Sequence, residues 1–392
     1  MKNMSQILSD RVVRLADSPT LRLLAKVGEL QARGKSIFEF HIGEPGFPIP
    51  PNVAEAIKEA VNRGRTTYTH QAGLPSLREA ISRYYASQFG LHFSMDHIVV
   101  TSGPKDTIFK LLGTLINPGD KVIVIDPHWE AYGEQVEFFD GENIFVPRNK
   151  DDMSYPLDDL EEAAKQKPKA LILTDPDNPT GYKASTEELE AIADLARRND
   201  MIVLADEIYC LHCYDTPFRS VAHYYPEGTI ILSGASKPWA GTGLRVGYAL
   251  IPPALKEVAD QLAKFTGQAS SSVNLPAQYG IMEAMDNPET RAWEEKMVGE
   301  FRKRRDLVEA MIGHLLGYKL GGAFYAAPKT PVPSREFAER LLEEEGVCVL
   351  PLSDLSAETH GLFDHRVRLA YGAGLDTLEA GLAGFLRCLE KA

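Results

Sequence analysis

Short apolar runs recur along the middle of the chain, and each one stops at a polar or glycine-containing turn. The runs lie at residues 98–100, 122–125, 171–173, 202–204 and 230–232. Continuous apolar runs of this length are typical of strands that are covered on both faces, as in a mostly parallel sheet. The pattern therefore predicts a layered α/β domain, which we place at residues 48–285.

Helical patterns fill the intervals between these runs. Ser185 is followed three residues later by Glu188, which is the signature of a capping box, and an apolar stripe then runs from Leu189 to Ala196. Strands that alternate with amphipathic helices are the pattern of an α/β fold.

The pattern changes in the last quarter of the chain. A long charged helix is predicted at 294–313, and short strands follow, one of them around 347–350. We interpret the basic run at 302–305 as a solvated face of that helix. These elements predict a smaller α+β domain, formed by residues 1–47 and 286–392.

Composition narrows the function classes. The chain of 392 residues is too long for one compact core, and its formal net charge of −13 disfavours a nucleic-acid or membrane partner. No apolar run reaches the roughly 18 residues needed to span a bilayer, and Met1 to Asp10 contain no signal-peptide segment. Four cysteines do not make a disulfide framework, so we expect a cytoplasmic protein.

Cys210 and Cys213 form a C-x-x-C motif around His212. Such a motif can serve as a redox pair or as half of a metal site. No second ligand pair stands at zinc-site spacing, so we interpret the cysteines as small buried residues and expect no metal.

Three polar residues of different chemistry follow three of the apolar runs. Asn178, Asp206 and Lys237 are separated by 28 and 31 residues (206−178 and 237−206), about one strand-helix unit each. Ligands of open parallel sheets bind at the carboxyl ends of the strands. We therefore expect an amide, an acid and a lysine at one rim.

Pyridoxal phosphate requires such a set. It needs a lysine for a Schiff base, a carboxylate for the ring nitrogen, a donor beside the ring oxygen and an anion site for the phosphate. Lys237 is followed eight residues later by Arg245, and Ser102-Gly103 forms a strand-to-helix turn suited to an anion.

These residues stand within a longer series of motifs, in order: Ser18-Pro19-Thr20, Gly43-Glu44-Pro45-Gly46-Phe47, Tyr68-Thr69, Gly73 to Ile81, Asn117-Pro118-Gly119-Asp120, Pro127-His128-Trp129, Asp177 to Gly181, Asp206-Glu207-Ile208-Tyr209, Ser236-Lys237, Gly322-Ala323-Phe324-Tyr325 and Val367-Arg368-Leu369. The series resembles the class I aminotransferases of pyridoxal-phosphate fold type I, especially the bacterial aspartate aminotransferase-like branch. The resemblance covers nearly the whole chain. It implies a mostly parallel seven-stranded sheet in an α/β large domain, a smaller α+β domain, and a homodimer.

The resemblance also implies roles around the cofactor ring. Lys237 would form the Schiff base and carry the proton, and Asp206 would pair with the ring nitrogen. Asn178 and Tyr209 would bind the ring oxygen, and Trp129 would stack on the ring.

For the phosphate and the substrate, the resemblance implies a second set of residues. The phosphate would lie among Gly103, Pro104, Lys105, Ser236 and Arg245, with Tyr68 reaching it from a second subunit. The substrate α-carboxylate would be bound by Arg368 with Asn178 and Gly43, and a distal carboxylate by Thr20 and Lys105. This set favours a dicarboxylic acceptor and leaves the amino donor open.

The chain departs from the family pattern at several positions. Pro104 removes a backbone N–H from the phosphate turn, and Gly234 stands where many relatives have a hydroxyl, for which Ser233 is a substitute. Asp175 precedes the asparagine loop, and His128 replaces a common tyrosine.

Acidic residues near the site complicate the choice of substrate. Asp175, Asp177 and Glu44 would repel a second carboxylate or attract a basic side chain if they face the pocket.

Alternative functions share parts of this pattern. A lyase, a cyclising synthase or an oxidase acting on an amino acid would use the same cofactor, fold, Lys237 and Asp206. A transcription regulator with an aminotransferase-like sensor would need a DNA-binding module. A nicotinamide-dependent dehydrogenase would need a third glycine after Gly241-Thr242-Gly243.

Overall fold

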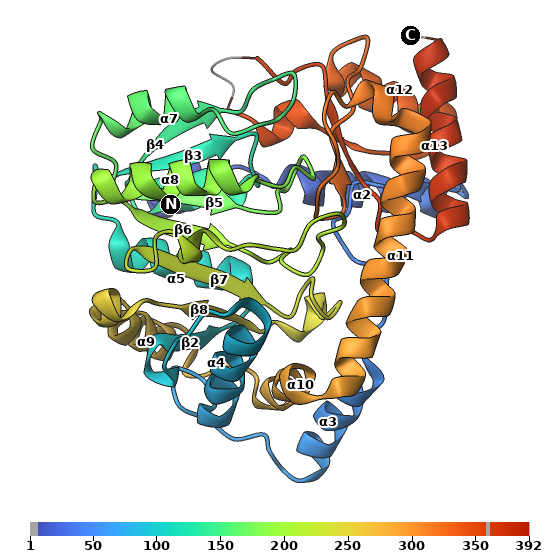
Figure 1. The fold of residues 1–392 in the computed structure, drawn as a ribbon. Helices are drawn as coiled ribbons and strands as arrows, with labels where there is room; N and C mark the ends of the chain where they lie inside the picture. The colour runs from blue at the N-terminus through green and yellow to red at the C-terminus, as the bar shows by residue number, and fades with distance from the viewer. Residues whose placement is uncertain (1–6, 358–360, 392) are drawn as a thin grey trace.

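The computed structural model describes residues 7–357 and 361–391. A seven-stranded sheet forms the centre of the larger part of the molecule (Figure 1). Its strands are, in spatial order, β2 (Ile98–Thr101), β8 (Gly247–Leu250), β7 (Thr229–Gly234), β6 (Ile202–Asp206), β5 (Ala170–Thr174), β3 (Lys121–Asp126) and β4 (Glu142–Pro147).

The sheet is mostly parallel, as predicted. Only β8 runs antiparallel to its neighbours, which are β2 and β7. The five predicted apolar runs form β2, β3, β5, β6 and β7. Sequence reasoning missed β4, which lies at the sheet edge and is only half-buried, and β8, which begins with a glycine. Edge position and glycine content both weaken the apolar signal of a strand.

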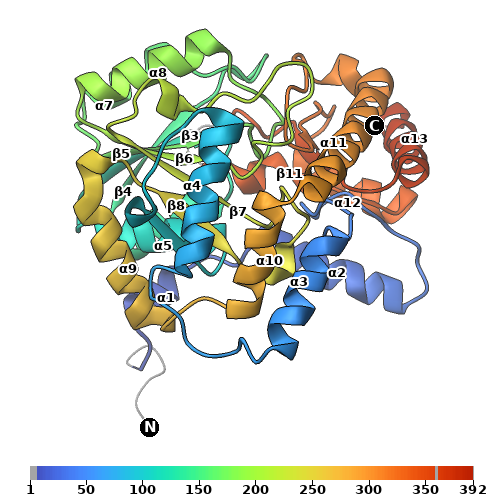
Figure 2. The same cartoon turned by 60° about the horizontal axis from the view of Figure 1, so that its bottom comes forward.

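Helices cover both faces of this sheet, which explains why its strands are apolar on both sides. On one face lie α5 (Pro104–Leu115), α6 (Ala131–Phe138) and α9 (Lys256–Ser270). On the other face lie α7 (Leu157–Ala164), α8 (Thr186–Arg198), α4 (Pro75–Phe89) and α10 (Leu275–Asp286). The Ser185–Glu188 capping box at the start of α8 is present as predicted. Figure 2 shows α3 (Pro51–Asn62) beside α10.

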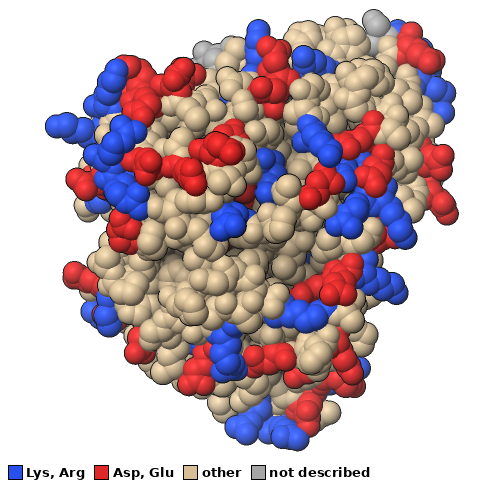
Figure 3. Space-filling view, viewed as in Figure 1, with Lys and Arg blue, Asp and Glu red and all other residues tan. Residues whose placement is uncertain are grey.

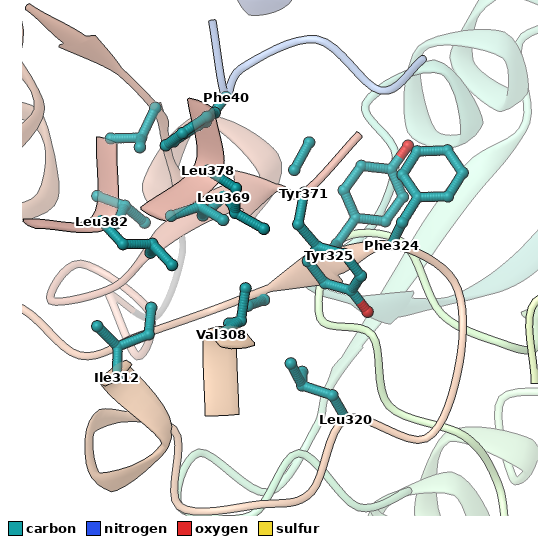
Figure 4. Close-up of a cluster of buried hydrophobic side chains, with 14 of the residues drawn as sticks. Phe40, Val308, Ile312, Leu320, Phe324, Tyr325, Leu369, Tyr371, Leu378 and Leu382 are labelled. Carbon is teal, nitrogen blue, oxygen red and sulfur yellow. The ribbon is translucent and has the colours of Figure 1, made fainter. Parts of the chain in front are cut away.

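The remaining elements form a smaller layered unit beside the sheet. Its helices are α2 (Pro19–Ala32), α11 (Pro288–Ile312), α12 (Ser334–Glu345) and α13 (Leu375–Glu390), whereas α1 (Asp10–Arg14) packs against α6 of the larger part. Its strands are β1 (Phe38–Glu39), β10 (Val347–Cys348), β11 (Leu350–Pro351), β12 (Val367–Ala370) and β9 (Tyr325–Ala326). The close-up in Figure 4 shows the core of this unit, where Val308 of α11 and Leu382 of α13 pack near Leu369. The predicted domain bounds, 48–285 for the large domain and 1–47 with 286–392 for the small one, remain a prediction.

The long charged helix begins earlier than predicted. α11 starts at Pro288 because Asn287 caps it, accepting a hydrogen bond from the Glu289 N–H at 2.8 Å. The interpretation of 302–305 as a solvated face is wrong for Arg304 and Arg305, which are 4% exposed.

Each of these arginines has a structural partner. Arg304 donates to the Gly372 carbonyl and lies over the Phe301 ring, and Arg305 pairs with Asp215 at 2.9 Å.

Charged residues of both signs are interspersed over the face shown in Figure 3. Within residues 7–357 and 361–391, no helix combines the length and apolar character needed to cross a bilayer.

Candidate functional site

Three polar residues lie where three neighbouring strands end. β5, β6 and β7 are adjacent and parallel, with Thr174 and Asp206 in register. Asp206 is the last residue of β6, Asn178 lies in the loop after β5, and Lys237 lies in the turn after β7. Because the carboxyl ends of parallel strands meet at one edge, the amide, the acid and the lysine share that edge.

The Lys237 amine lies among backbone and charged groups. Its Nζ donates a hydrogen bond to the carbonyl oxygen of Gly43. Burial lowers the pKa of Lys237 to about 8, against the opposing charge of Glu44. The guanidinium groups of Arg368 and Arg245 also lower this pKa. An amine with such a pKa is partly uncharged near neutral pH, which a nucleophile and a general base both require.

Asp206 is buried, and a donor binds each of its oxygens. Oδ2 accepts from the Tyr132 hydroxyl at 2.7 Å, and Oδ1 accepts from the Ile208 N–H at 3.2 Å. Burial raises the pKa of Asp206, whereas these donors and the charge of Lys237 lower it. Sequence reasoning missed Tyr132, although it follows Trp129 by one turn and its N–H bonds to the Trp129 carbonyl.

Arg368 is a residue of the smaller unit that reaches this strand edge. It is buried in β12, where Nη1 donates to Asn178 Oδ1 at 3.1 Å and Nη2 donates to the His41 carbonyl at 2.6 Å. Two of the five guanidinium donors are thereby used, so three remain for a carboxylate. His41 was not predicted. Burial lowers its pKa to about 4, with the charge of Arg368 adding to the shift, so its ring is neutral at pH 7.

Two tyrosines meet at the junction of the two units. The hydroxyls of Tyr209 and Tyr325 lie 2.8 Å apart, and both side chains are buried. A Cβ at position 43 would overlap the Tyr325 hydroxyl, so only glycine permits this approach. Figure 4 shows Tyr325 beside Phe324 at one end of the small-unit core. The sequence predicts a role for Tyr209 and Gly43 but not for Tyr325, although Tyr325 ends the Gly322-Ala323-Phe324-Tyr325 motif.

The start of α5 has the features of an anion site. Gly103 caps this helix with a φ of 99°, and a Cβ there would collide with the Arg245 guanidinium. Arg245 donates to the Thr242 carbonyl at 2.9 Å. A helix N-terminus beside a guanidinium favours a bound anion. Lys105, in the first turn of α5, has its Nζ 4.6 Å from the centroid of the Trp129 ring.

The remaining residues predicted to form the site, Ser236, Tyr68 and Thr20, differ in how far they are buried. Ser236 is buried directly before Lys237. Tyr68 lies between α3 and α4 and is 85% exposed, so its side chain does not enter the site of its own chain. Thr20 is half-buried in the first turn of α2.

The sequence model of the family "Aminotransferase class I and II" matches residues 35–381. The chain belongs to this family. The resemblance expected from the motifs is therefore confirmed, and this aminotransferase moves an amino group between an amino acid and a 2-oxo acid.

Relatives match the aminotransferase over its whole length. It is 36% identical to the aspartate/prephenate aminotransferase of Thermus thermophilus over 394 residues, which cover 98% of this chain and 99% of that one. It is 32% identical to the asparagine–oxo-acid transaminase of Streptococcus mutans over 401 residues, covering 98% and 99%. A solved structure of aspartate aminotransferase from Thermus thermophilus with maleate has a TM-score of 0.92 and 35% identity, covering 99% and 100%.

Two acidic residues of the aminotransferase turn away from the site. Asp175 accepts a hydrogen bond from the Ala184 N–H at 2.7 Å. Asp177 pairs with the buried Arg148 at 3.2 Å and accepts from the Thr180 N–H. These partners are backbone groups and a buried arginine that hold the loop before Asn178.

His128 is likewise committed to a structural contact. Its Nδ1 lies 2.9 Å from the Asp126 carboxylate, and its ring stacks on Phe145.

The two departures from the family pattern at Pro104 and Gly234 are linked in space. A Cβ at Gly234 would lie 3.0 Å from Pro104 Cγ, so the proline ring fills the place of a side chain there. Ser233 is no substitute for the missing hydroxyl. It pairs in register with Tyr248, whose ring packs against Tyr85 on the opposite face of the sheet.

Cys210 and His212 of the C-x-x-C motif are buried, and Cys213 is partly buried. Burial raises the pKa of both Cys210 and Cys213, and the Cys213 thiol donates to the Cys210 carbonyl at 3.6 Å. Within the described residues, no three metal-ligating side chains cluster.

Proposed function

We propose that this aminotransferase binds pyridoxal 5′-phosphate covalently through Lys237. When bound, this cofactor supplies a ring that withdraws electrons from the α-carbon of an amino acid. The observation that carries the proposal is the pairing of a lysine of lowered pKa with a buried carboxylate at one strand edge. The cradle of Gly103 and Arg245, which a Cβ would fill, supports the fit of a phosphate.

Asp206 is suited to hold a positive charge on the ring nitrogen. Hydrogen bonds from Tyr132 and Ile208 stabilise its ionised form against the cost of burial. A cation in front of this carboxylate, such as a protonated ring nitrogen, removes the remaining cost of burying its charge. Asn178 and Tyr209 are placed to bind the ring oxygen, and Trp129 to cover the ring.

Lys237 acts again after the amino acid has entered. Its Nζ takes the proton from the α-carbon and returns it in the reverse direction. This role needs an uncharged amine, which the pKa of about 8 supports.

Arg368 binds the α-carboxylate of the substrate. Asn178 and the His41 carbonyl orient its guanidinium, which leaves three donors for two carboxylate oxygens. Lys105 and Thr20 take a distal carboxylate, so the acceptor is an acidic 2-oxo acid such as 2-oxoglutarate. The aspartate-related name of the Thermus relative agrees with this choice.

The working assembly is a homodimer in which Tyr68 reaches the phosphate of the neighbouring subunit. Its 85% exposure and the apolar side chains exposed near the N-terminus support a covered surface in the assembly. Those side chains are Ile7, Leu8, Val12, Val13, Leu15, Leu21 and Leu24.

Hybrid dimers test the shared site. Mixing Lys237→Ala subunits with Tyr68→Ala subunits gives hybrids in which one site has both native residues. We expect the inactive or weakened parents to regain activity on mixing, toward about one quarter of the native value for random exchange. If mixing restores nothing although native mass measurements detect hybrids, Tyr68 does not act across subunits.

A panel of amino acids tests the reaction itself. The visible absorbance band of the cofactor-loaded protein is expected to fall when an amino acid is added and to return with 2-oxoglutarate. Lys237→Ala is the control and should lack this response. Release of ammonia or pyruvate without a 2-oxo acid would instead indicate a lyase, and a colourless reconstituted protein would refute the cofactor assignment.

A further inference from the structure

A cavity of about 570 Å³ lies beside the proposed cofactor site. The N-terminal segment 15–19 forms one wall, and the starts of α5 and α6 form another. Lys105 and Glu130 both line it. Lys105 follows the phosphate turn, and Glu130 directly follows Trp129. The cavity therefore begins at the residues proposed to hold the cofactor, where the far end of a substrate side chain would reach.

Glu130 offers a buried acceptor here. Its Oε1 accepts a hydrogen bond from Ser18 Oγ at 2.9 Å. Its Oε2 is buried and has no hydrogen-bond partner among the described residues. A buried carboxylate oxygen without a donor is costly, and a ligand N–H would remove that cost.

Lys105 offers the complementary donor. Its Nζ lies over the Trp129 ring, and no carboxylate oxygen of the described residues lies within 4.0 Å of it. Four other charged side chains on the wall are already bonded: Arg22 and Arg335 to Asp354, and Glu134 to the Ala16 N–H. Lys105 and Glu130 thus line the same cavity, one with a donor that has no carboxylate partner and the other with an acceptor oxygen that has no donor among the described residues.

We propose that the amino donor carries a carboxamide side chain, as in glutamine or asparagine, and that Lys105 and Glu130 recognise it together. This inference rests on the proposed function and extends it to the donor. A carboxamide has an acceptor oxygen for the Lys105 ammonium and two N–H donors for Glu130. Lys105 and Glu130 are then both bonded by one planar ligand group.

A donor with a charged side chain, whether acidic or basic, would match only one of the two residues, Lys105 or Glu130. A distal carboxylate binds Lys105 but sets a negative charge against Glu130, and a basic side chain binds Glu130 but faces Lys105. The distal carboxylate of the acidic acceptor binds Lys105 and Thr20 but gains nothing from Glu130, so the acceptor binds more weakly than the matching amide.

Unreactive analogues without the α-amino group separate these cases. We would measure dissociation constants by calorimetry on the cofactor-loaded protein, comparing succinamate with succinate and glutaramate with glutarate. For at least one of the two lengths, the amide should bind about tenfold or more tightly than the diacid. In Glu130→Gln that preference should fall to about one or reverse, because the like charge is removed while an acceptor for Ser18 is kept.

Glu134→Gln is the matched control, since Glu134 lines the same wall and already has a donor. It should keep the native preference. A native preference for both diacids, or an equal change in Glu130→Gln and Glu134→Gln, would overturn the inference while amino transfer persists. A protein that binds no pyridoxal phosphate would overturn the proposed function and this inference with it.

Discussion

The two ends of the proposed cofactor site are built differently. We call one the ring side (Tyr132, Asp206, Tyr209 and Lys237) and the other the phosphate side (Gly103, Pro104, Gly234 and Arg245). On the ring side, hydrogen bonds join the side chains to one another or to backbone groups, as in the 2.7 Å bond from Tyr132 to Asp206. These bonds fix charge and proton positions. Changes on this side should therefore alter the chemistry more than the fold.

The phosphate side is held by close backbone approach. Gly234 and Gly247 face each other in register, and a Cβ at Gly247 would collide with the Gly103-Pro104 turn. Gly234 lacks the hydroxyl that many relatives have at this position, and Pro104 lacks a backbone N–H. In their place, the proline ring packs against the two glycines, Gly234 and Gly247. Changes on this side should alter stability and cofactor retention more than the rate of the loaded enzyme.

The largest effect is expected from Asp206→Asn. Losing the charge opposite the ring nitrogen should lower kcat by about 10²- to 10³-fold, because a preorganised electrostatic partner is removed. The free energy of unfolding should not fall, since burial already raises the pKa of Asp206 and a neutral amide avoids that cost. Steady-state kinetics and urea denaturation measure the two quantities, with the exposed Asp158→Asn as the control. A variant within tenfold of the native kcat would break the contrast between the two sides.

Gly234→Ser should have a smaller effect, and on the fold. Its Cβ would lie 2.6 Å from the Val246 carbonyl oxygen and 3.0 Å from Pro104 Cγ, so the free energy of unfolding should fall by about 1–3 kcal/mol. Adding Pro104→Ala should restore only part of this loss, because the Val246 contact remains. Denaturation of the cofactor-free proteins measures both variants. A single variant as stable as the native protein, or no gain in the double variant, would show that packing does not govern the phosphate side.

Sequence patterns predicted the ring side well because its residues follow strands. Apolar runs and their spacing predict a shared edge for Asn178, Asp206 and Lys237. This prediction requires β5, β6 and β7 to be neighbours, and they are. Parallel strands end at the same edge of a sheet, so residues that directly follow them can be placed without side-chain detail.

Side-chain direction could not be predicted in the same way. Asp175 and Asp177 stand beside Asn178 in sequence, yet backbone and arginine partners turn them inward. The local sequence indicates a solvent-exposed face for Arg304 and Arg305. Their partners, Gly372 and Asp215, lie far away along the chain and so leave no trace in that local pattern. Long-range partners of this kind leave no local pattern in a single sequence.

The smallest expected effect is a change in the pKa of Lys237 when the neighbouring charge of Glu44 is removed. Only the uncharged amine attacks the cofactor aldehyde, so recombination of the cofactor-free protein with pyridoxal phosphate should quicken as pH rises and level off above about 8, the lowered pKa of Lys237. The Glu44 carboxylate raises this pKa, so Glu44→Gln should move the midpoint down by roughly half a unit. Stopped-flow absorbance at several pH values gives the midpoints, and Glu55→Gln on the exposed face of α3 is the control. Because the titrations of the cofactor itself are common to all three proteins, the difference between midpoints isolates the lysine. A midpoint that rises in Glu44→Gln, or one near the ordinary lysine value in the native protein, would mean that burial and neighbouring charges do not tune the ring side as inferred.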